Sequence, residues 1–183
     1  MPAIIAIFAS SSEALPSTWY TRTEKFGEKL AIAGYEMIYG GGNNGLMGSF
    51  ARGVHARCGK LTGVIPRFLR EAGYCFEAAR QIIVTETLAE RKRIMHEKSD
   101  AFLALPGGYG TFDELFGVIA EKQLSCHDKP IVLWDIDSFF DPFFAFVAAL
   151  KRQNCIGEID HTLYEIVKTD DELLELLAKY FPV

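Results

Sequence analysis

The sequence predicts a single α/β domain: a doubly wound, Rossmann-like parallel sheet with helices on both faces. Three observations predict this fold class. Short apolar runs alternate with longer helical patterns from one end of the chain to the other. The runs are continuously apolar, as in strands that are buried on both faces of a sheet. With 183 residues, 49 % of them hydrophobic, the chain suffices for one core, so residues 1–183 are assigned to one domain.

The predicted elements follow one another as strand and helix. The expected strands are residues 4–8, 36–39, 61–65, 81–85, 101–105 and 130–134, with a seventh candidate at 164–168. The expected helices are residues 19–33, 46–57, 88–98, 112–124, 139–151 and 171–180. This alternation implies right-handed βαβ units, and no repeat, low-complexity tract or linker interrupts it.

Composition excludes several classes of function. The net charge of −5 argues against DNA or RNA as a partner. The four cysteines form no CxxC pair and the four histidines show no metal-binding spacing, so neither a structural zinc nor another metal is expected. No run approaches the ~20 apolar residues of a membrane helix. We therefore expect a reduced, cytoplasmic protein without a membrane segment.

Three turns that follow predicted strands have unusual composition. They are ASSS at 9–12, GGGNNG at 40–45 and PGGYGT at 106–111. In a doubly wound sheet, ligands bind beyond the carboxyl ends of the strands, where such turns lie. Glycine allows backbone to approach a ligand closely, and a helix N-terminus favours an anion. Two glycine loops at one sheet edge favour phosphate binding over tight turns alone.

The first glycine loop also matches GxGxxG, the dinucleotide-binding pattern. It follows the second strand instead of the first, and the next strand ends without a carboxylate for a ribose 2′-hydroxyl. Arg67 is placed to meet a 2′-phosphate, so an NADP-binding alternative stays open.

The second glycine loop leads into a helix that carries Glu114. Thr111 and Glu114 have the spacing of a capping box, in which Glu114 serves only the helix start. The same position places a carboxylate at the ligand edge of the sheet. Both interpretations stay open on spacing alone.

A basic segment, ERKR at 90–93, opens the preceding predicted helix. Thr87 and Glu90 have capping-box spacing, which places Arg91 in the first turn at the ligand edge. A guanidinium there can bind phosphate or ribose with two parallel hydrogen bonds, as a lysine cannot. Lys92 and Arg93 are equally well explained as a solvated face.

Together these motifs resemble the Lonely Guy family, the cytokinin riboside 5′-monophosphate phosphoribohydrolases, many of which carry an older "lysine decarboxylase" label. The resemblance covers nearly the whole chain. It lies in YGGGNNGLMG at 39–48, GVIP at 63–66, ERK at 90–92, SDAFLALPGGYGTFDEL at 99–115 and QLSCHDKPIVL at 123–133. The PGGxGTxxE element with the upstream Arg-Lys pair is the most specific part.

The resemblance implies that Arg91 and Glu114 are the catalytic pair of a hydrolase that splits the N-glycosidic bond of a nucleoside 5′-monophosphate. AMP and a cytokinin riboside 5′-monophosphate are the substrates considered, the latter implying a role in cytokinin biosynthesis. The resemblance also implies a homodimer with the active site near the interface, and it implies no cofactor. The residues expected to bind substrate are Ser10, Gly41, Gly42, Lys92, Gly107, Gly108, Tyr109, Gly110 and Thr111.

The sequence departs from the family at the first turn, which reads FASSS where relatives often have FCGSS, and at AEKQL (120–124), which replaces a common TWAQL. These departures leave the preferred base open. A non-catalytic nucleotide carrier on the same fold is the main alternative, because glycine loops would serve it equally well. A pyridoxal-phosphate decarboxylase needs a Schiff-base lysine, and Lys92 is the one lysine near the predicted site.

Overall fold

The computed structural model describes residues 2–157 and 163–182. Its seven strands form one parallel sheet in the order β4-β3-β2-β1-β5-β6-β7. The strands are β1 (Ile4–Phe8), β2 (Glu36–Tyr39), β3 (Lys60–Pro66), β4 (Gln81–Thr85), β5 (Ala101–Ala104), β6 (Ile131–Trp134) and β7 (Glu165–Val167). The predicted doubly wound fold and all seven predicted strands are confirmed.

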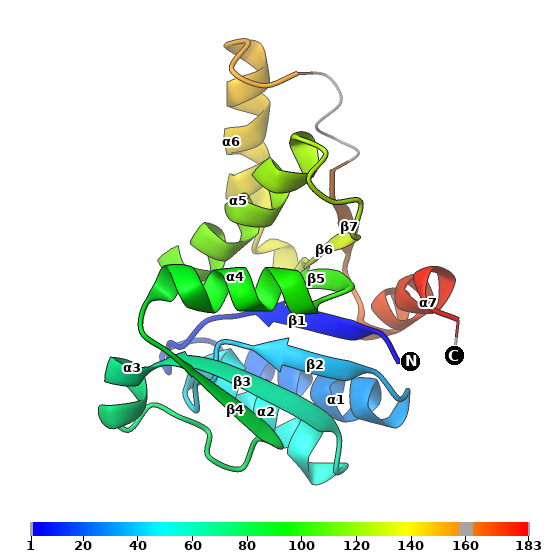
Figure 1. Ribbon diagram of the computed structural model, residues 1–183. Helices are drawn as coiled ribbons and strands as arrows, with labels where there is room; N and C mark the ends of the chain where they lie inside the picture. The colour runs from blue at the N-terminus through cyan, green and yellow to red at the C-terminus, as the bar shows by residue number, and fades with distance from the viewer. Residues whose placement is uncertain (1, 158–162, 183) are drawn as a thin grey trace.

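Helices cover both faces of the sheet (Figure 1). One face carries α1 (Ser17–Ile32), α2 (Gly45–Ala56) and α7 (Asp170–Tyr180). The other carries α4 (Leu88–Lys98), α5 (Tyr109–Gln123) and α6 (Asp141–Arg152). The two faces have separate apolar cores because alternate residues of each strand point to opposite sides. Phe26, Phe50 and Trp134 lie in the first core, and Phe8, Phe102 and Phe140 in the second.

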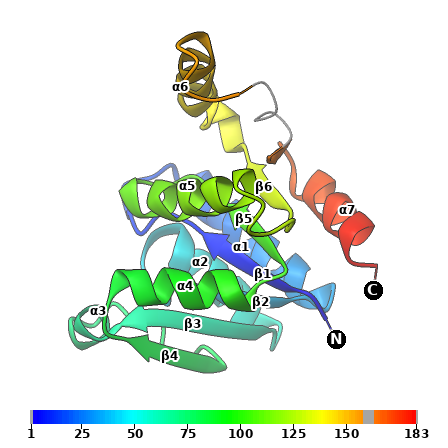
Figure 2. The same cartoon turned by 45° about the horizontal axis from the view of Figure 1, so that its top comes forward.

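Three differences from the predicted elements stand out. A short helix, α3 (Arg67–Glu71), follows β3 where no helix was expected, and a 3-10 turn (Ile136–Ser138) precedes α6. The α5 helix begins at Tyr109, three residues before the predicted start. At its far end α6 projects beyond the body of the domain (Figure 2).

The chain changes its direction of winding at β1. Strands β2, β3 and β4 are added on one side of β1, and β5, β6 and β7 on the other. The connection that leaves β1 therefore runs to one side of the sheet, and the connection that leaves β5 runs to the other. Between them a crevice opens, which the turns after β1, β2 and β5 border. Ser10 N donates to the Pro106 carbonyl at 3.1 Å and Met47 N to the Ser10 carbonyl at 3.2 Å, so the three turns are tied together.

No helix in residues 2–157 or 163–182 is long and apolar enough to cross a membrane.

Candidate active site

A cavity of about 640 Å³ lies at the carboxyl edge of the sheet, within the usual size range of small-molecule sites. One wall is polar and comes from the turns after β1 and β2 together with the start of α5. Another part of the lining, the apolar wall, comes mainly from α2, β3, α3 and α4. The polar lining is Ser10, Ser11, Ser12, Asn43, Asn44, Gly108, Gly110 and Thr111, and the apolar lining is Met47, Ile65, Leu69, Tyr74 and Leu88.

Arg91 and Glu114 meet in this cavity as a buried ion pair. Nη2 of Arg91 donates to Oε1 of Glu114, and the side chains are only 12 % and 6 % exposed. Arg91 comes from the first turn of α4, and Glu114 comes from the second turn of α5. Burial raises the pKa of the Glu114 carboxyl, and the adjacent Arg91 guanidinium opposes that rise.

The guanidinium of Arg91 lies over the glycine loop that follows β2. A Cβ atom added at Gly40 would lie 3.3 Å from Cζ and Nη1 of Arg91, so this position leaves little room for a side chain. Nε of Arg91 is buried and has no hydrogen-bond partner among the described residues. Leaving a buried donor without a partner is costly, and this nitrogen would meet a ligand only after the guanidinium shifts.

Of the two interpretations left open for Glu114, the structure shows the carboxylate at the ligand edge and not the capping box with Thr111. Gly108 is the N-cap of α5 and makes no side-chain capping bond, so Thr111 lies inside the first turn. Glu114 is turned to Arg91 instead of back to the helix start. A Cβ at Gly107 would lie 2.0 Å from Oγ1 of Thr111, so the bare glycine makes room for this hydroxyl.

One of the two hydrogen bonds of the capping box predicted for α4 is present. Thr87 accepts from Glu90 N at 3.0 Å, as a capping residue does. The Glu90 carboxylate accepts from Glu86 N at 2.9 Å rather than from the cap residue. Arg91 is accordingly held in the first turn of α4, as the sequence predicts.

Most residues predicted to bind substrate line the cavity. They are Ser10, Gly42, Gly108, Tyr109, Gly110 and Thr111. Gly41, Gly107 and Lys92 do not. Gly41 has φ +75° and packs against Ile65, where a Cβ would come within 2.8 Å of the Ile65 Cβ. Lys92 Nζ pairs with Asp113 at 2.6 Å and lines a separate cavity between α4 and α5.

The two glycine loops differ in how much of their backbone is free for a ligand. In the first, Asn43 N donates to the Tyr74 carbonyl at 2.8 Å and the Gly41 carbonyl accepts from Phe76 N at 2.9 Å. Much of that loop is therefore fixed by the chain itself. The second loop opens α5, and the first amides of an α-helix have no intrahelical acceptor. Tyr109, 99 % exposed, stands beside it at the cavity mouth.

The sequence did not reveal the apolar wall or the place of Gly40. The apolar patterns of the helices and strands that contain Met47, Ile65 and Leu88 are the same as those of core residues. Only the relative placement of α2, β3 and α4 distinguishes them from the core.

Arg67, the residue on which the NADP alternative depended, pairs with Glu86 on the surface and does not line the cavity. Among residues 2–157 and 163–182, no group of three or more His, Cys, Asp or Glu side chains is arranged to hold a metal ion.

Comparison with known proteins adds three findings. Residues 47–177 match the family model described as possible lysine decarboxylase. The chain is 33 % identical to the cytokinin riboside 5′-monophosphate phosphoribohydrolase LOG2 of Arabidopsis thaliana, over 97 % of this chain and 84 % of that protein. It is 34 % identical to the phosphoribohydrolase LOG of Oryza sativa subsp. japonica, over 97 % and 74 % of the two chains.

Solved structures share the fold. The molybdenum cofactor binding protein of Rippkaea orientalis superposes with a TM-score of 0.75 at 20 % identity, over 98 % of each chain. The molybdenum cofactor carrier protein of Chlamydomonas reinhardtii gives 0.74 at 20 % identity, again over 98 % of each chain. At this level of identity the likeness is one of fold alone.

Proposed function

Because the chain belongs to the Lonely Guy family, whose model carries the lysine decarboxylase description, we propose that it hydrolyses the N-glycosidic bond of a nucleoside 5′-monophosphate. The products are the free base and ribose 5-phosphate. One observation carries the proposal: Arg91 and Glu114, from separate helices, form a buried pair inside a cavity of nucleotide size.

Glu114 supplies the charge that the reaction needs. Breaking a glycosidic bond leaves an oxocarbenium-like ribosyl cation, which a buried carboxylate stabilises more strongly than water does. Glu114 accepts a proton from the attacking water as the water oxygen bonds to C1′ and the bond between C1′ and the base nitrogen breaks. The departing base takes up one proton from solvent, and Glu114 returns its proton to solvent, so the protons balance. Burial, which raises the pKa of Glu114, suits the carboxyl to this proton transfer.

Arg91 holds the carboxylate and the substrate in one geometry. Its Nη2 donates to Glu114 and opposes the rise in the pKa of that carboxyl, while the guanidinium, which lines the cavity, donates to a ribose hydroxyl or a phosphate oxygen. Fixing the reacting carbon against the carboxylate lowers the activation free energy, because the translational and rotational entropy is already lost on binding.

The polar wall is assigned to the 5′-phosphate. The first amides of α5, the helix dipole and the Thr111 hydroxyl all favour an anion at this point, and Ser10, whose N donates to the Pro106 carbonyl, lines the cavity beside the same turn. The apolar wall of Met47, Ile65 and Leu88 then faces the base. It accommodates adenine and, equally, an adenine with an apolar N6 substituent as in a cytokinin riboside 5′-monophosphate.

A homodimer with the active site near the interface belongs to the same proposal. Tyr109 is fully exposed at the cavity mouth, and Phe116 of α5 and Phe146 of α6 are exposed aromatics 6.4 Å apart, centroid to centroid. A second copy that covers this side would bury these rings next to the cavity.

A decarboxylase gains no support from the geometry. Lys92 pairs with Asp113 and faces the cavity between α4 and α5, so no lysine lines the Arg91–Glu114 cavity among the described residues. The carrier alternative shares the fold and the phosphate-binding turn, and differs only in lacking turnover.

The test is incubation with AMP, with an N6-isopentenyl derivative of AMP and with adenosine, each with and without EDTA, followed by chromatography for free base. We expect free base and ribose 5-phosphate from the monophosphates, unchanged by EDTA. Adenosine should react slower by several orders of magnitude, because charge-assisted contacts are worth ~1.5–3 kcal/mol each.

Equal rates with adenosine would contradict the assignment of the polar wall, and loss of activity in EDTA would contradict the metal-free reaction. Binding of AMP without release of base would identify a carrier.

A further inference from the structure

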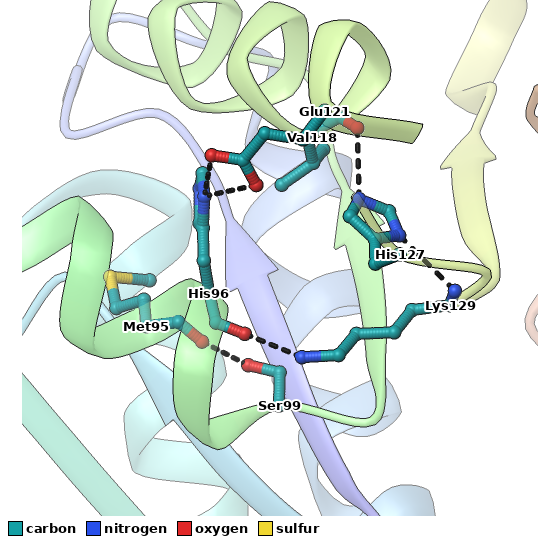
Figure 3. Close-up of polar contacts among 7 residues, drawn as sticks. All are labelled: Met95, His96, Ser99, Val118, Glu121, His127 and Lys129. Carbon is teal, nitrogen blue, oxygen red and sulfur yellow. Dashed lines mark hydrogen bonds and ion pairs between the residues drawn. The ribbon is translucent and has the colours of Figure 1, made fainter. Parts of the chain in front are cut away.

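A second polar cluster joins α4 to α5 (Figure 3), and its residues line a cavity separate from the Arg91–Glu114 cavity. Nδ1 of His96 lies 3.1 and 3.3 Å from the two carboxylate oxygens of Glu121. His96 comes from the last turns of α4 and Glu121 from the last turn of α5. The contact therefore connects the two helices that carry the proposed catalytic pair.

The spacing of the contacts fixes how the two helices lie against each other. Lys92 and His96 are four residues apart on α4, so they lie on one face. They contact Asp113 and Glu121 on α5, which are eight residues apart and share a face as well. Gly117 lies between these two, and a Cβ there would be 3.4 Å from Cε1 of His96. Two contacts that lie one helical turn apart on α4 and about two turns apart on α5 resist both sliding and rotation of α4 over α5.

The catalytic pair adjoins this row of contacts. Arg91 precedes Lys92 in α4, and Glu114 follows Asp113 in α5. A slide of one helix over the other that broke the His96–Glu121 contact would also change the separation of Arg91 and Glu114.

The segment that follows α5 braces the same contact. Lys129 Nζ donates to the His96 carbonyl at 2.7 Å, and Lys129 N donates to Nδ1 of His127 at 3.1 Å. Because Nδ1 of His127 accepts, its Nε2 carries the proton and donates to the Val118 carbonyl at 3.0 Å. One short segment is thus bonded both to the end of α4 and to α5.

The environment of His96 makes the contact a directed hydrogen bond. Its Nε2 is buried without a partner among the described residues, and its ring lies against Phe8 and Phe102. Burial lowers the pKa of His96, opposed by Glu121 and assisted by the positive charges of Lys92 and Lys129. A neutral ring with its proton on Nδ1 satisfies these surroundings, since a proton on Nε2 would have no acceptor.

We propose that His96 and Glu121 are positioning residues that fix α4 against α5 and thereby hold the Arg91 guanidinium against the Glu114 carboxylate. The inference rests on the proposed hydrolysis for its kinetic consequence. Its structural content, the placement of one helix by the other, does not depend on any reaction.

The main variant is Glu121→Ala, because Glu121 is half exposed and its removal leaves the core intact. We expect kcat for AMP to fall about tenfold or more while KM changes less than threefold, because a small misplacement of the reacting groups costs rate. Glu121→Gln retains an acceptor for Nδ1–H and should recover kcat to within about threefold. His96→Asn, which keeps a donor near the Nδ1 position, should retain more activity than His96→Leu.

Glu97→Ala is the matched control. Glu97 lies next to His96 and borders the same cavity, yet its ion pair among the described residues is with exposed Arg93. It should leave kcat unchanged. Assays run well below the unfolding temperature of every variant separate positioning from stability. Wild-type kcat in Glu121→Ala, or equal losses in Glu121→Ala and Glu97→Ala, would overturn the proposal.

Hydrogen exchange of the α4 amides tests the positioning role without measuring catalysis. Glu121→Ala should speed exchange in residues 91–96 about tenfold, and Glu97→Ala should not. A wild-type protein that releases no base but shows this difference would refute the hydrolase and keep the positioning role. An active wild-type protein without the difference would refute the positioning role alone.

Discussion

Glu114 illustrates how one side chain can be assigned only when its surroundings are known. A carboxylate that is 6 % exposed would be strongly destabilising without a partner, since a buried unpaired charge costs several kcal/mol. Arg91 supplies that partner from another helix. Spacing along the chain predicted the place of both residues at the sheet edge, but it also allowed a helix cap at Glu114. Arg91 and Glu114 are 23 residues apart in the sequence, and the packing of the βαβ units brings them into contact. Local sequence patterns cannot predict that contact.

Glu114→Gln should reduce turnover of AMP by about 10²–10³ or more and leave nucleotide affinity within a few-fold. A group that stabilises charge only in the transition state acts on rate and not on binding. Turnover is measured by release of free base, and affinity by calorimetric titration of AMP.

Asp113→Asn is the neighbouring control. Asp113 faces Lys92 outside the cavity, and the amide oxygen can still accept that bond, so activity should stay within about threefold. Near-normal turnover in Glu114→Gln would remove Glu114 from the chemistry.

Among the elements, the strands were the most accurately predicted from the sequence. Every expected strand is present, because a continuous apolar run between polar turns has few other interpretations. The start of α5 was missed because Gly108 and Gly110 read as loop. A first helical turn tolerates glycine there, since its amides have no intrahelical acceptor in any case. The α3 helix, five residues long, has no period to detect.

The packing of α1 on α2 depends on glycines that bring the two backbones into contact. A Cβ at Gly53 would lie 1.9 Å from the Glu24 carbonyl oxygen, and one at Gly27 would lie 2.5 Å from that of Phe50. Because α2 begins in the glycine loop that supports Arg91, this packing also places one wall of the cavity.

Gly53→Ala should therefore lower the free energy of unfolding by about 1–3 kcal/mol, the usual cost of overpacking. Urea denaturation followed by circular dichroism measures it. Gly157→Ala, where a Cβ would meet nothing within 4 Å among the described residues, should leave the denaturation midpoint unchanged. Equal midpoints for the two variants would show that α1 and α2 separate without cost.

For the whole molecule, the open question is what covers the exposed side of α5 and α6. Phe146 is 51 % exposed on the projecting helix, and Phe116 lies beside it. Such rings are costly in water and typical of the buried part of protein interfaces. The sequence suggested a dimer through its family resemblance and through the apolar helices expected over residues 112–124 and 139–150, and Phe116 and Phe146 lie on these two helices.

Phe146→Asp should convert the proposed homodimer into monomers and reduce AMP hydrolysis with it, because a charge in an apolar interface is left without a partner. Multi-angle light scattering gives the mass at assay concentration. Ile32→Asp changes an exposed apolar residue of α1, on the opposite face, and should alter neither mass nor rate. A fully active Phe146→Asp monomer would argue against an active site that needs the second copy.

The central position of β1 also determines when the sheet can be completed during synthesis. Ile5 is paired with Met37 on one side and with Ala101 on the other, so one edge of the first strand waits for a partner about a hundred residues later. Closing so long a loop is slow compared with local pairing. Until β5 emerges, the backbone of β1 has one unpaired edge, the Phe8 ring lacks its neighbour Phe102, and Glu114 has not yet been synthesised. The emerging protein must therefore pass its most aggregation-prone stage without any ligand to stabilise it.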